Sequence, residues 1–205
     1  MSRTIRLATP FDGAALAEIY RPHVEDSAVS FEIEAPDAVE MAARVNSLIE
    51  STPWLVCVDD GMGVLGYAYA SRHRDRHAYR WSVEVTAYVR GDAHRGGIGR
   101  ALYASLFQIL ALQGYRNAYA GITLPNPPSE GLHAALGFTF IGVYDSAGYK
   151  LGRWHDVGWY ERRISPCTPE PEPPLPLAAI VGTPPFGAAL AAGEPLLAAR
   201  RHGSP

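Results

Sequence analysis

Cysteine is scarce in this chain of 205 residues, and long apolar runs are missing from it. Cys57 stands in an apolar segment and Cys167 in a proline-rich one, so the pair does not make the disulfide framework of a small secreted protein. No apolar run reaches the roughly 18 residues that a transmembrane helix needs, and no signal-peptide core follows the first residues. These absences predict a cytoplasmic protein without a membrane partner.

A strong positive charge is also missing, because the formal net charge is −3. Proteins that bind nucleic acid in bulk have a basic surface, so no nucleic-acid partner is expected. The chain lacks the clustered Cys and His residues of a zinc site, and no metal is expected. His155 and Asp156 invite a triad interpretation, but no serine or cysteine nucleophile with supporting spacing is evident.

Periodicity along the first 164 residues predicts a mixed sheet flanked by helices, which is an α/β or α+β fold. The expected strands cover residues 4–8, 54–58, 64–70, 81–89, 118–123, 138–144 and 155–163. The expected helices cover residues 10–24, 38–49, 97–113 and 129–136. Asp37, with Glu40 three residues later, is expected to begin the second helix as an N-cap with a capping-box partner.

The composition changes after Ile164, since more than half of the prolines stand beyond it. Proline removes a backbone donor and fixes φ, so residues 165–205 are predicted to be a mostly disordered tail behind a domain of residues 1–164. One alternative stays open. The apolar stretch from Ala188 to Leu197 can fold locally or dock on the domain.

Three glycines, Gly96, Gly97 and Gly99, join the strand at 81–89 to the helix that follows. A glycine loop at a helix N-terminus is an anion site, because free N–H groups and the helix dipole meet there. A Walker A loop needs Lys and Ser or Thr after its last glycine, and a Rossmann loop needs glycine where Leu102 stands. The remaining candidate is the pyrophosphate loop of acetyl-CoA-dependent N-acetyltransferases, and its alternative is a turn with glycines for chain geometry alone.

Five segments extend this interpretation: residues 84–89, 94–99, 124–129, 132–138 and 152–159. Together they resemble the phosphinothricin and methionine sulfoximine N-acetyltransferase branch of the GNAT superfamily. The resemblance implies the GNAT fold, with splayed central strands flanked by helices, and acetyl-CoA as co-substrate. It also implies a small amino-acid-like substrate, direct attack of its amine on the thioester, and a homodimer. The segment 154–156 is interpreted as packing the last strand pair and helping the dimer contact.

The resemblance also assigns residues to acetyl-CoA. The backbone of Ala87, Tyr88 and Val89 is expected to pair with the pantetheine arm, as a peptide pairs with a sheet edge. The pyrophosphate is expected at His94, Arg95, Gly96, Gly97, Ile98 and Gly99, and the pantetheine also at Asn126 and Ser129. His94 stands where the superfamily has Gln or Arg, which departs from the usual first contact.

Acetyl transfer to an amine needs a base, because an α-amino group with a pKa of about 8 is mostly protonated near neutral pH. Glu84 is the candidate base, and its alternative is an outward-facing strand residue. His133 is the candidate acid for coenzyme A, and its alternative is a helix histidine satisfied by packing and one hydrogen bond.

The basic segment 72–80 is the expected recognition element for an acid group, since guanidinium donors match carboxylate oxygens. The resemblance selects Arg74, Arg76 and Tyr79 there, and Phe31 as an aromatic wall of the pocket. Without the resemblance, such a basic loop is more often part of the solvated surface. Arg72 and Arg80 are expected to be such surface residues. Two rival functions remain open: acetylation of another amine, such as a protein N-terminus, or an acyl-CoA-binding regulator without catalysis.

Overall fold

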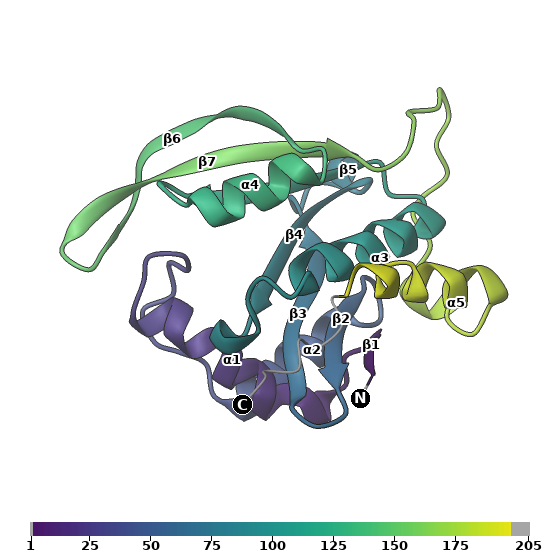
Figure 1. Ribbon diagram of the computed structural model, residues 1–205. Coiled ribbons are helices and arrows are strands. Elements are labelled where there is room, and N and C mark those ends of the chain that lie inside the picture. Colours follow the sequence, from purple (N-terminus) through teal and green to yellow (C-terminus); the bar gives the residue numbers. More distant parts are fainter. Residues whose placement is uncertain (1, 198–205) are drawn as a thin grey trace.

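One seven-stranded sheet, in the order β1-β2-β3-β4-β5-β7-β6, organises the computed structural model, which describes residues 2–197 (Figure 1). Its strands are β1 (Arg3–Leu7), β2 (Trp54–Asp59), β3 (Gly63–Arg72), β4 (Ser82–Val89), β5 (Asn117–Thr123), β6 (Thr139–Lys150) and β7 (Arg153–Arg163). Neighbouring strands are antiparallel except β4 and β5, which are parallel. The mixed sheet expected from the sequence is confirmed.

Helices cover both faces of the sheet. The α-helices are α1 (Gly13–Glu25), α2 (Ala38–Leu48), α3 (Ile98–Gln113), α4 (Pro127–Ala135) and α5 (Pro184–Ala191). Short 3-10 turns are η1 (Pro10–Asp12), η2 (His77–Tyr79), η3 (Gly91–Ala93), η4 (Leu177–Ala179) and η5 (Glu194–Leu196). No helix among residues 2–197 is long and apolar enough to cross a membrane.

Two hydrophobic clusters follow from the alternation of side chains along the strands. In β2, Leu55 and Cys57 join the cluster under α3 and α5, while Trp54 and Val56 join the cluster under α1 and α2. Because every second residue faces the same helix layer, β2 is buried on both faces and occupies the middle of the core.

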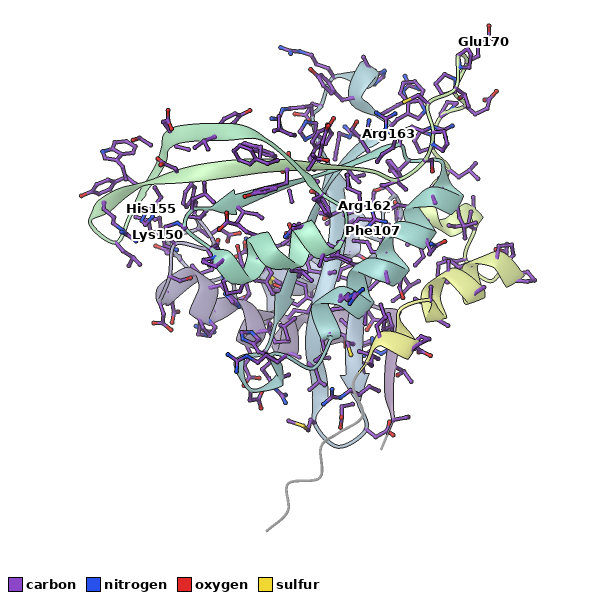
Figure 2. The ribbon with its side chains drawn as sticks, turned by 45° about the horizontal axis from the view of Figure 1, so that its top comes forward. Phe107, Lys150, His155, Arg162, Arg163 and Glu170 are labelled. Carbon is purple, nitrogen blue, oxygen red and sulfur yellow. The ribbon has the colours of Figure 1, made fainter. Side chains whose placement is uncertain are left out.

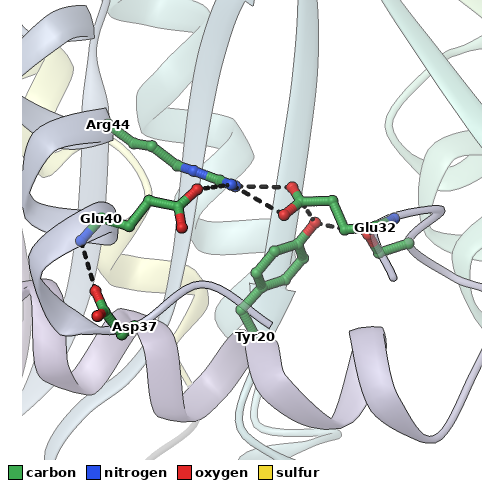
Figure 3. A network of polar contacts seen from close by, with 6 residues as sticks. Tyr20, Glu32, Asp37, Glu40 and Arg44 are labelled. Carbon is green, nitrogen blue, oxygen red and sulfur yellow. Dashed lines mark hydrogen bonds and ion pairs between the residues drawn. The ribbon is translucent and has the colours of Figure 1, made fainter. Parts of the chain in front are cut away.

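An ion-pair network anchors the segment between α1 and α2 (Figure 3). Asp37 accepts the Glu40 N–H at 2.8 Å, which confirms the predicted N-cap of α2. The Glu40 carboxylate binds Arg44, and Arg44 also holds both oxygens of Glu32, at 2.7 and 2.9 Å. The Tyr20 hydroxyl donates to Glu32 as well, so α1, α2 and the segment carrying Phe31 are tied together.

The central strands splay apart beyond residue 84. β4 pairs with β3 along its whole length, from Gly66 opposite Val89 to Arg72 opposite Val83. Its pairing with β5 covers only residues 82–84. The β5-facing edge of residues 85–89 therefore has no strand opposite it, which is the splayed geometry that the resemblance implied.

The hairpin of β6 and β7 is longer than the sequence predicted. The two expected strands ended at residue 144 and began at residue 155, whereas the hairpin continues to a tight turn at Leu151 and Gly152. Both turn residues have positive φ, at 49° and 78°, as a two-residue hairpin turn of type I′ requires. A register shift between Tyr144 and Gly148 interrupts the alternation, and this irregularity concealed the strand.

The C-terminal segment differs from the predicted disordered tail over residues 177–197. Leu177, Ile180, Phe186 and Ala189 are buried in the same cluster as α3, and α5 lies beside α3 in Figure 1. The alternative left open for the stretch from Ala188 to Leu197, local folding or docking on the domain, is the one that the structure has. Residues 198–205, the rest of the predicted tail, lie outside the described residues.

Two features explain why prolines did not keep this segment unfolded. Pro184 and Pro185 occupy the first turn of α5, where backbone N–H groups have no acceptor inside the helix, so their absence costs no hydrogen bond. Thr183 caps the helix by accepting the Phe186 N–H. Gly193 approaches α3 so closely that a Cβ would lie 1.9 Å from the Ala101 oxygen. The core therefore extends beyond β7 and the predicted boundary at residue 164.

Candidate active site

A cavity of about 360 Å³ opens where β4 and β5 separate. It is lined by Glu84, Val85 and Thr86 of β4, Gly121 and Thr123 of β5, Tyr144, Ala147, Val157 and Trp159 of the β6–β7 hairpin, and Val29 and Phe31 of the segment after α1. Such a volume is typical of a small-molecule site. Glu84 is the one ionisable carboxylate on these walls, and the predicted base therefore faces a cavity.

The Glu84 carboxylate is held through one of its oxygens. Oε1 accepts from Arg74 Nη1 at 3.0 Å and lies 3.0 Å from His73 Nδ1. Among residues 2–197, Oε2 has no hydrogen-bond partner. Because 32% of the surface of the Glu84 side chain is exposed, Oε2 is free to accept a proton from a molecule in the cavity.

His73 was not selected from the sequence, although it stands in the basic segment. Its ring stacks on Tyr119 at 4.3 Å between centroids. Burial lowers the pKa of His73 from its usual value, and the positive charge of Arg74 lowers it further, while Glu84 raises it. A histidine among seven other charged or polar residues of the segment 72–80 gives no signal of its own, because its contact with Glu84 depends on the pairing of β3 with β4.

The loop between β4 and α3 forms a cradle of free N–H groups. Arg95 and Gly97 have positive φ, at 63° and 76°, and α3 begins directly after Gly97. From Arg95 to Gly99, no backbone N–H has a hydrogen-bond partner among the described residues. These donors and the N-terminus of α3 together offer an anion site of the kind that the sequence predicted.

The His94 side chain has a different role from the free backbone N–H groups of residues 95–99. Its Nε2 lies 2.9 Å from the Val89 carbonyl, so the ring donates to the end of β4 and closes the loop. Its side chain is thereby committed to the protein backbone. The backbone N–H groups that follow it are the candidate donors to an anion.

Asn126 and Ser129 begin α4, and their contacts fit a helix cap. Asn126 Oδ1 accepts the Ser129 N–H at 3.2 Å, and the Asn126 N–H donates to Glu130. The Asn126 side-chain amide N–H group has no partner among the described residues and is available to a ligand.

His133 is buried, with 5% of its surface exposed, and it lies outside the cavity wall. Nδ1 donates to the Ser129 carbonyl at 2.8 Å, and Nε2 lies 3.4 Å from the Tyr103 hydroxyl. Its ring packs against Phe138 at 4.9 Å. Burial lowers its pKa, although the Ser129 carbonyl acts in the opposite direction. These contacts fit the alternative of a packed histidine, and its role as acid stays a prediction.

The four predicted substrate residues separate into two groups. Phe31 lines the cavity, and Arg74 contacts Glu84 with its guanidinium 5.7 Å from the Trp159 ring centre. Arg76 lines a neighbouring cavity of about 540 Å³, together with Arg72, Arg74 and Arg80. Tyr79 is exposed and reaches the edge of the His73 ring at 5.9 Å. Only Phe31 and Arg74 are therefore brought together with Glu84.

Lys150 is a residue that the sequence analysis missed. It is buried at the tip of the hairpin, and Nζ donates to the carbonyls of Val24 and Ser30 (Figure 2). The Lys150 carbonyl in turn accepts from His155 Nε2 at 3.0 Å. The hairpin thereby fixes the segment that carries Phe31. Within residues 154–156, His155 is buried and fits the predicted packing role, whereas Trp154 is exposed. Among residues 2–197, no group of three or more His, Cys, Asp or Glu side chains is arranged to hold a metal ion.

Comparison with known proteins adds three findings. Residues 5–159 match the family described as an acetyltransferase (GNAT) domain. The chain is 41% identical to a phosphinothricin N-acetyltransferase of Streptomyces viridochromogenes over 172 residues, which are 83% of this chain and 93% of the relative. It is 31% identical to an L-methionine sulfoximine/L-methionine sulfone acetyltransferase of Pseudomonas paraeruginosa, over 83% of this chain and the whole relative.

A solved structure agrees with these relatives. The crystal structure of a GNAT superfamily phosphinothricin acetyltransferase from Sinorhizobium meliloti, in complex with acetyl-CoA, superposes with a TM-score of 0.79 at 34% identity. The match covers 91% of this chain and 97% of that one.

Proposed function

The chain belongs to the GNAT acetyltransferase family, and we propose that it transfers the acetyl group of acetyl-CoA to the amino group of a small amino-acid-like substrate. One observation carries the proposal. Glu84 lies in a cavity directly beside the unpaired edge of β4, with one carboxylate oxygen free. An amine in this cavity meets a base at the place where the strand edge is open to a thioester.

The residues present fit acetyl-CoA. The free N–H groups of residues 95–99 offer several donors to a pyrophosphate, and the unpaired edge at Ala87, Tyr88 and Val89 offers groups to the amides of pantetheine. The free side-chain amide donor of Asn126 lies at the N-terminus of α4, and Ser129 lies in the first turn of the same helix. Acetyl-CoA supplies the activated acetyl thioester, and the chain holds it through its backbone.

Glu84 prepares the amine. A protonated amino group has no lone pair for attack, so its proton has to leave before the new bond forms. Oε2 is the acceptor, directly or through one water, because Oε1 is already occupied by His73 and Arg74. The carboxylate is thus both positioned and available.

Arg74 and Phe31 supply the recognition of the substrate. The Arg74 guanidinium has donors beyond the one that Glu84 uses, and these suit the acid group of an amino acid. Phe31 and Trp159 offer apolar walls to a side chain of moderate size. Arg76 and Tyr79 stay predictions, since neither lines the cavity that contains Glu84 and neither bonds to Glu84 as Arg74 does.

A panel of amines separates this proposal from its rivals. Release of coenzyme A is measured with phosphinothricin, methionine sulfoximine, methionine sulfone, other amino acids, a peptide N-terminus and a polyamine. The arginine-rich segment disfavours the polyamine, because like charges repel. Turnover with the peptide N-terminus alone would show that the substrate is a protein N-terminus and not a small amino acid. Calorimetric binding of acetyl-CoA without any turnover would favour the non-catalytic regulator.

We also propose a homodimer through the β6–β7 hairpin. β6 is the edge of the sheet, and large exposed apolar side chains gather on the hairpin: Phe140, Ile141, Val143, Tyr144, Tyr149, Leu151 and Trp154. A second copy offers the same edge, which suits the self-complementary interface of a two-fold dimer. Light scattering on the purified protein gives the mass, and a monomer at micromolar concentration contradicts this assembly.

A further inference from the structure

His73 occupies a closely packed place behind the base. Only 11% of its side chain is exposed. Its ring stacks on Tyr119 and meets the edges of Tyr79 and Trp159, at 5.9 and 6.2 Å between centroids. Three aromatic side chains from separate elements therefore fix the orientation of the imidazole, and this orientation directs Nδ1 at Glu84.

The contact between the two residues defines a tautomer. A carboxylate can only accept hydrogen bonds, so the hydrogen of a neutral His73 stands on Nδ1, 3.0 Å from Oε1. Arg74 donates to the same oxygen. Two donors on Oε1 leave Oε2 as the single free acceptor, and rotation of the carboxylate would break both bonds.

We propose that His73 is a positioning residue for the base, and that gain of a proton by its imidazole switches the base to a weaker form. This inference rests on the proposed function, because it assigns a partner to the proposed base. It places a titrating group in a hydrogen bond with the carboxylate whose other oxygen receives the proton of the amine.

The charges around the imidazole give the direction of the switch. Glu84 faces it from β4, Arg74 from the following loop, Tyr79 from η2 and Tyr119 from β5. Burial and Arg74 together lower the pKa of His73 below its ordinary value of 6.5, so the ring is neutral at neutral pH. Acidification makes it a cation, and a cation beside a carboxylate weakens the attraction of that carboxylate for a proton. Turnover is therefore lost as the pH falls below about 6.5.

Two substitutions separate hydrogen bonding from packing. His73→Asn keeps a donor near the position of Nδ1 and cannot take up a proton, while His73→Phe keeps a ring on Tyr119 without a donor. We expect kcat at pH 8 to fall about tenfold in His73→Phe and to stay within about threefold of wild type in His73→Asn. The acidic limb of the kcat profile that belongs to His73 is absent in His73→Asn. Both variants bind acetyl-CoA with the wild-type Kd.

Three results overturn the inference: a wild-type kcat in His73→Phe, an equal loss in both variants, or a wild-type acidic limb in His73→Asn. A further measurement needs no turnover. The His73 ring resonance, assigned by its absence in His73→Asn, is titrated by NMR in the wild type and in Glu84→Gln. The pKa of His73 falls in Glu84→Gln, because the carboxylate that raises it is gone. An equal pKa in both proteins contradicts the coupling, whereas absent turnover contradicts the proposed function alone.

Discussion

The ring of Phe31 lies on Gly148 so closely that a Cβ at position 148 would stand 2.4 Å from the ring. This contact joins the segment after α1 to the β6–β7 hairpin at the cavity wall. It follows that the position of Phe31 depends on the absence of a side chain on the opposite strand.

Gly148→Ala tests this dependence. The added methyl group pushes Phe31 aside, and we expect the KM for the amine to rise about tenfold. Gly142→Ala is the matched control, because nothing lies within 4 Å of a Cβ there. Steady-state kinetics on both variants measure the effect. Equal KM values in the two variants would remove Phe31 from the substrate wall.

Glu84→Gln tests the base. The amide keeps the shape of the side chain but cannot take the proton, and kcat is expected to fall at least about a hundredfold. Calorimetry should give an unchanged Kd for acetyl-CoA, since Glu84 lies outside the loop of residues 95–99. Glu34→Gln, an exposed change, serves as control. Turnover that survives in Glu84→Gln excludes this residue as the base.

Gly97→Ala tests the anion cradle. Gly97 has a φ of 76°, where an alanine loses about 1–2 kcal/mol relative to glycine. We expect the affinity for acetyl-CoA to fall about tenfold, as the loop moves away from this conformation. Gly91→Ala controls for a neighbouring glycine with open space around it. Calorimetry decides the point, and equal Kd values would mean that the glycines serve chain geometry alone.

Lys150→Met tests the clamp at the hairpin tip. Methionine keeps the apolar stem but leaves the Val24 and Ser30 carbonyls without their donor, which lowers the free energy of unfolding by about 2–4 kcal/mol. Arg153→Met, an exposed change in the same hairpin, should have little effect. Urea unfolding of both variants gives the difference. A loss below that of the control would show that the clamp contributes no stability.

His133→Asn tests the buried histidine through the pH dependence of stability. The folded protein disfavours the charged ring, so the pKa of His133 lies below its ordinary value, and the unfolded chain binds the proton more readily. Stability contributed by the neutral ring is present above about pH 6.5, the ordinary value in the unfolded chain, and is lost as the pH falls from there through the lowered pKa of the folded protein. The free energy of unfolding between pH 7 and pH 5.5 should therefore fall more in wild type than in His133→Asn. Equal slopes contradict the burial of this group, and the kcat of the same variant decides its role as acid.

Local sequence signals predicted the elements that depend on nearby residues. The N-cap at Asp37 and the glycine loop before α3 were visible, because each is built from residues within one turn of the chain. The contact of His73 with Glu84 was not visible, since it depends on the register that sets Ser71 opposite Glu84. Nor did the sequence indicate that Arg74 contacts Glu84 while Arg76 does not, although both line the cavity of about 540 Å³.

The C-terminal segment shows how composition can mislead. The apolar residues of α3 stand on more than one face of the helix, with Leu106, Phe107 and Ile109 all buried. A helix that is apolar around its circumference needs a second cover besides the sheet. The high proline count drew attention away from this requirement. In the structure, Leu177, Ile180 and Phe186 cover the face of α3 that the sheet does not cover.

Lys150 is the only lysine of the chain, and its amine is turned inward. An amine-reactive reagent added to the folded protein therefore finds no lysine to modify until the hairpin tip separates from the Val24 and Ser30 carbonyls. The rate of modification at this single position therefore measures how often the hairpin tip separates from the segment that carries Phe31.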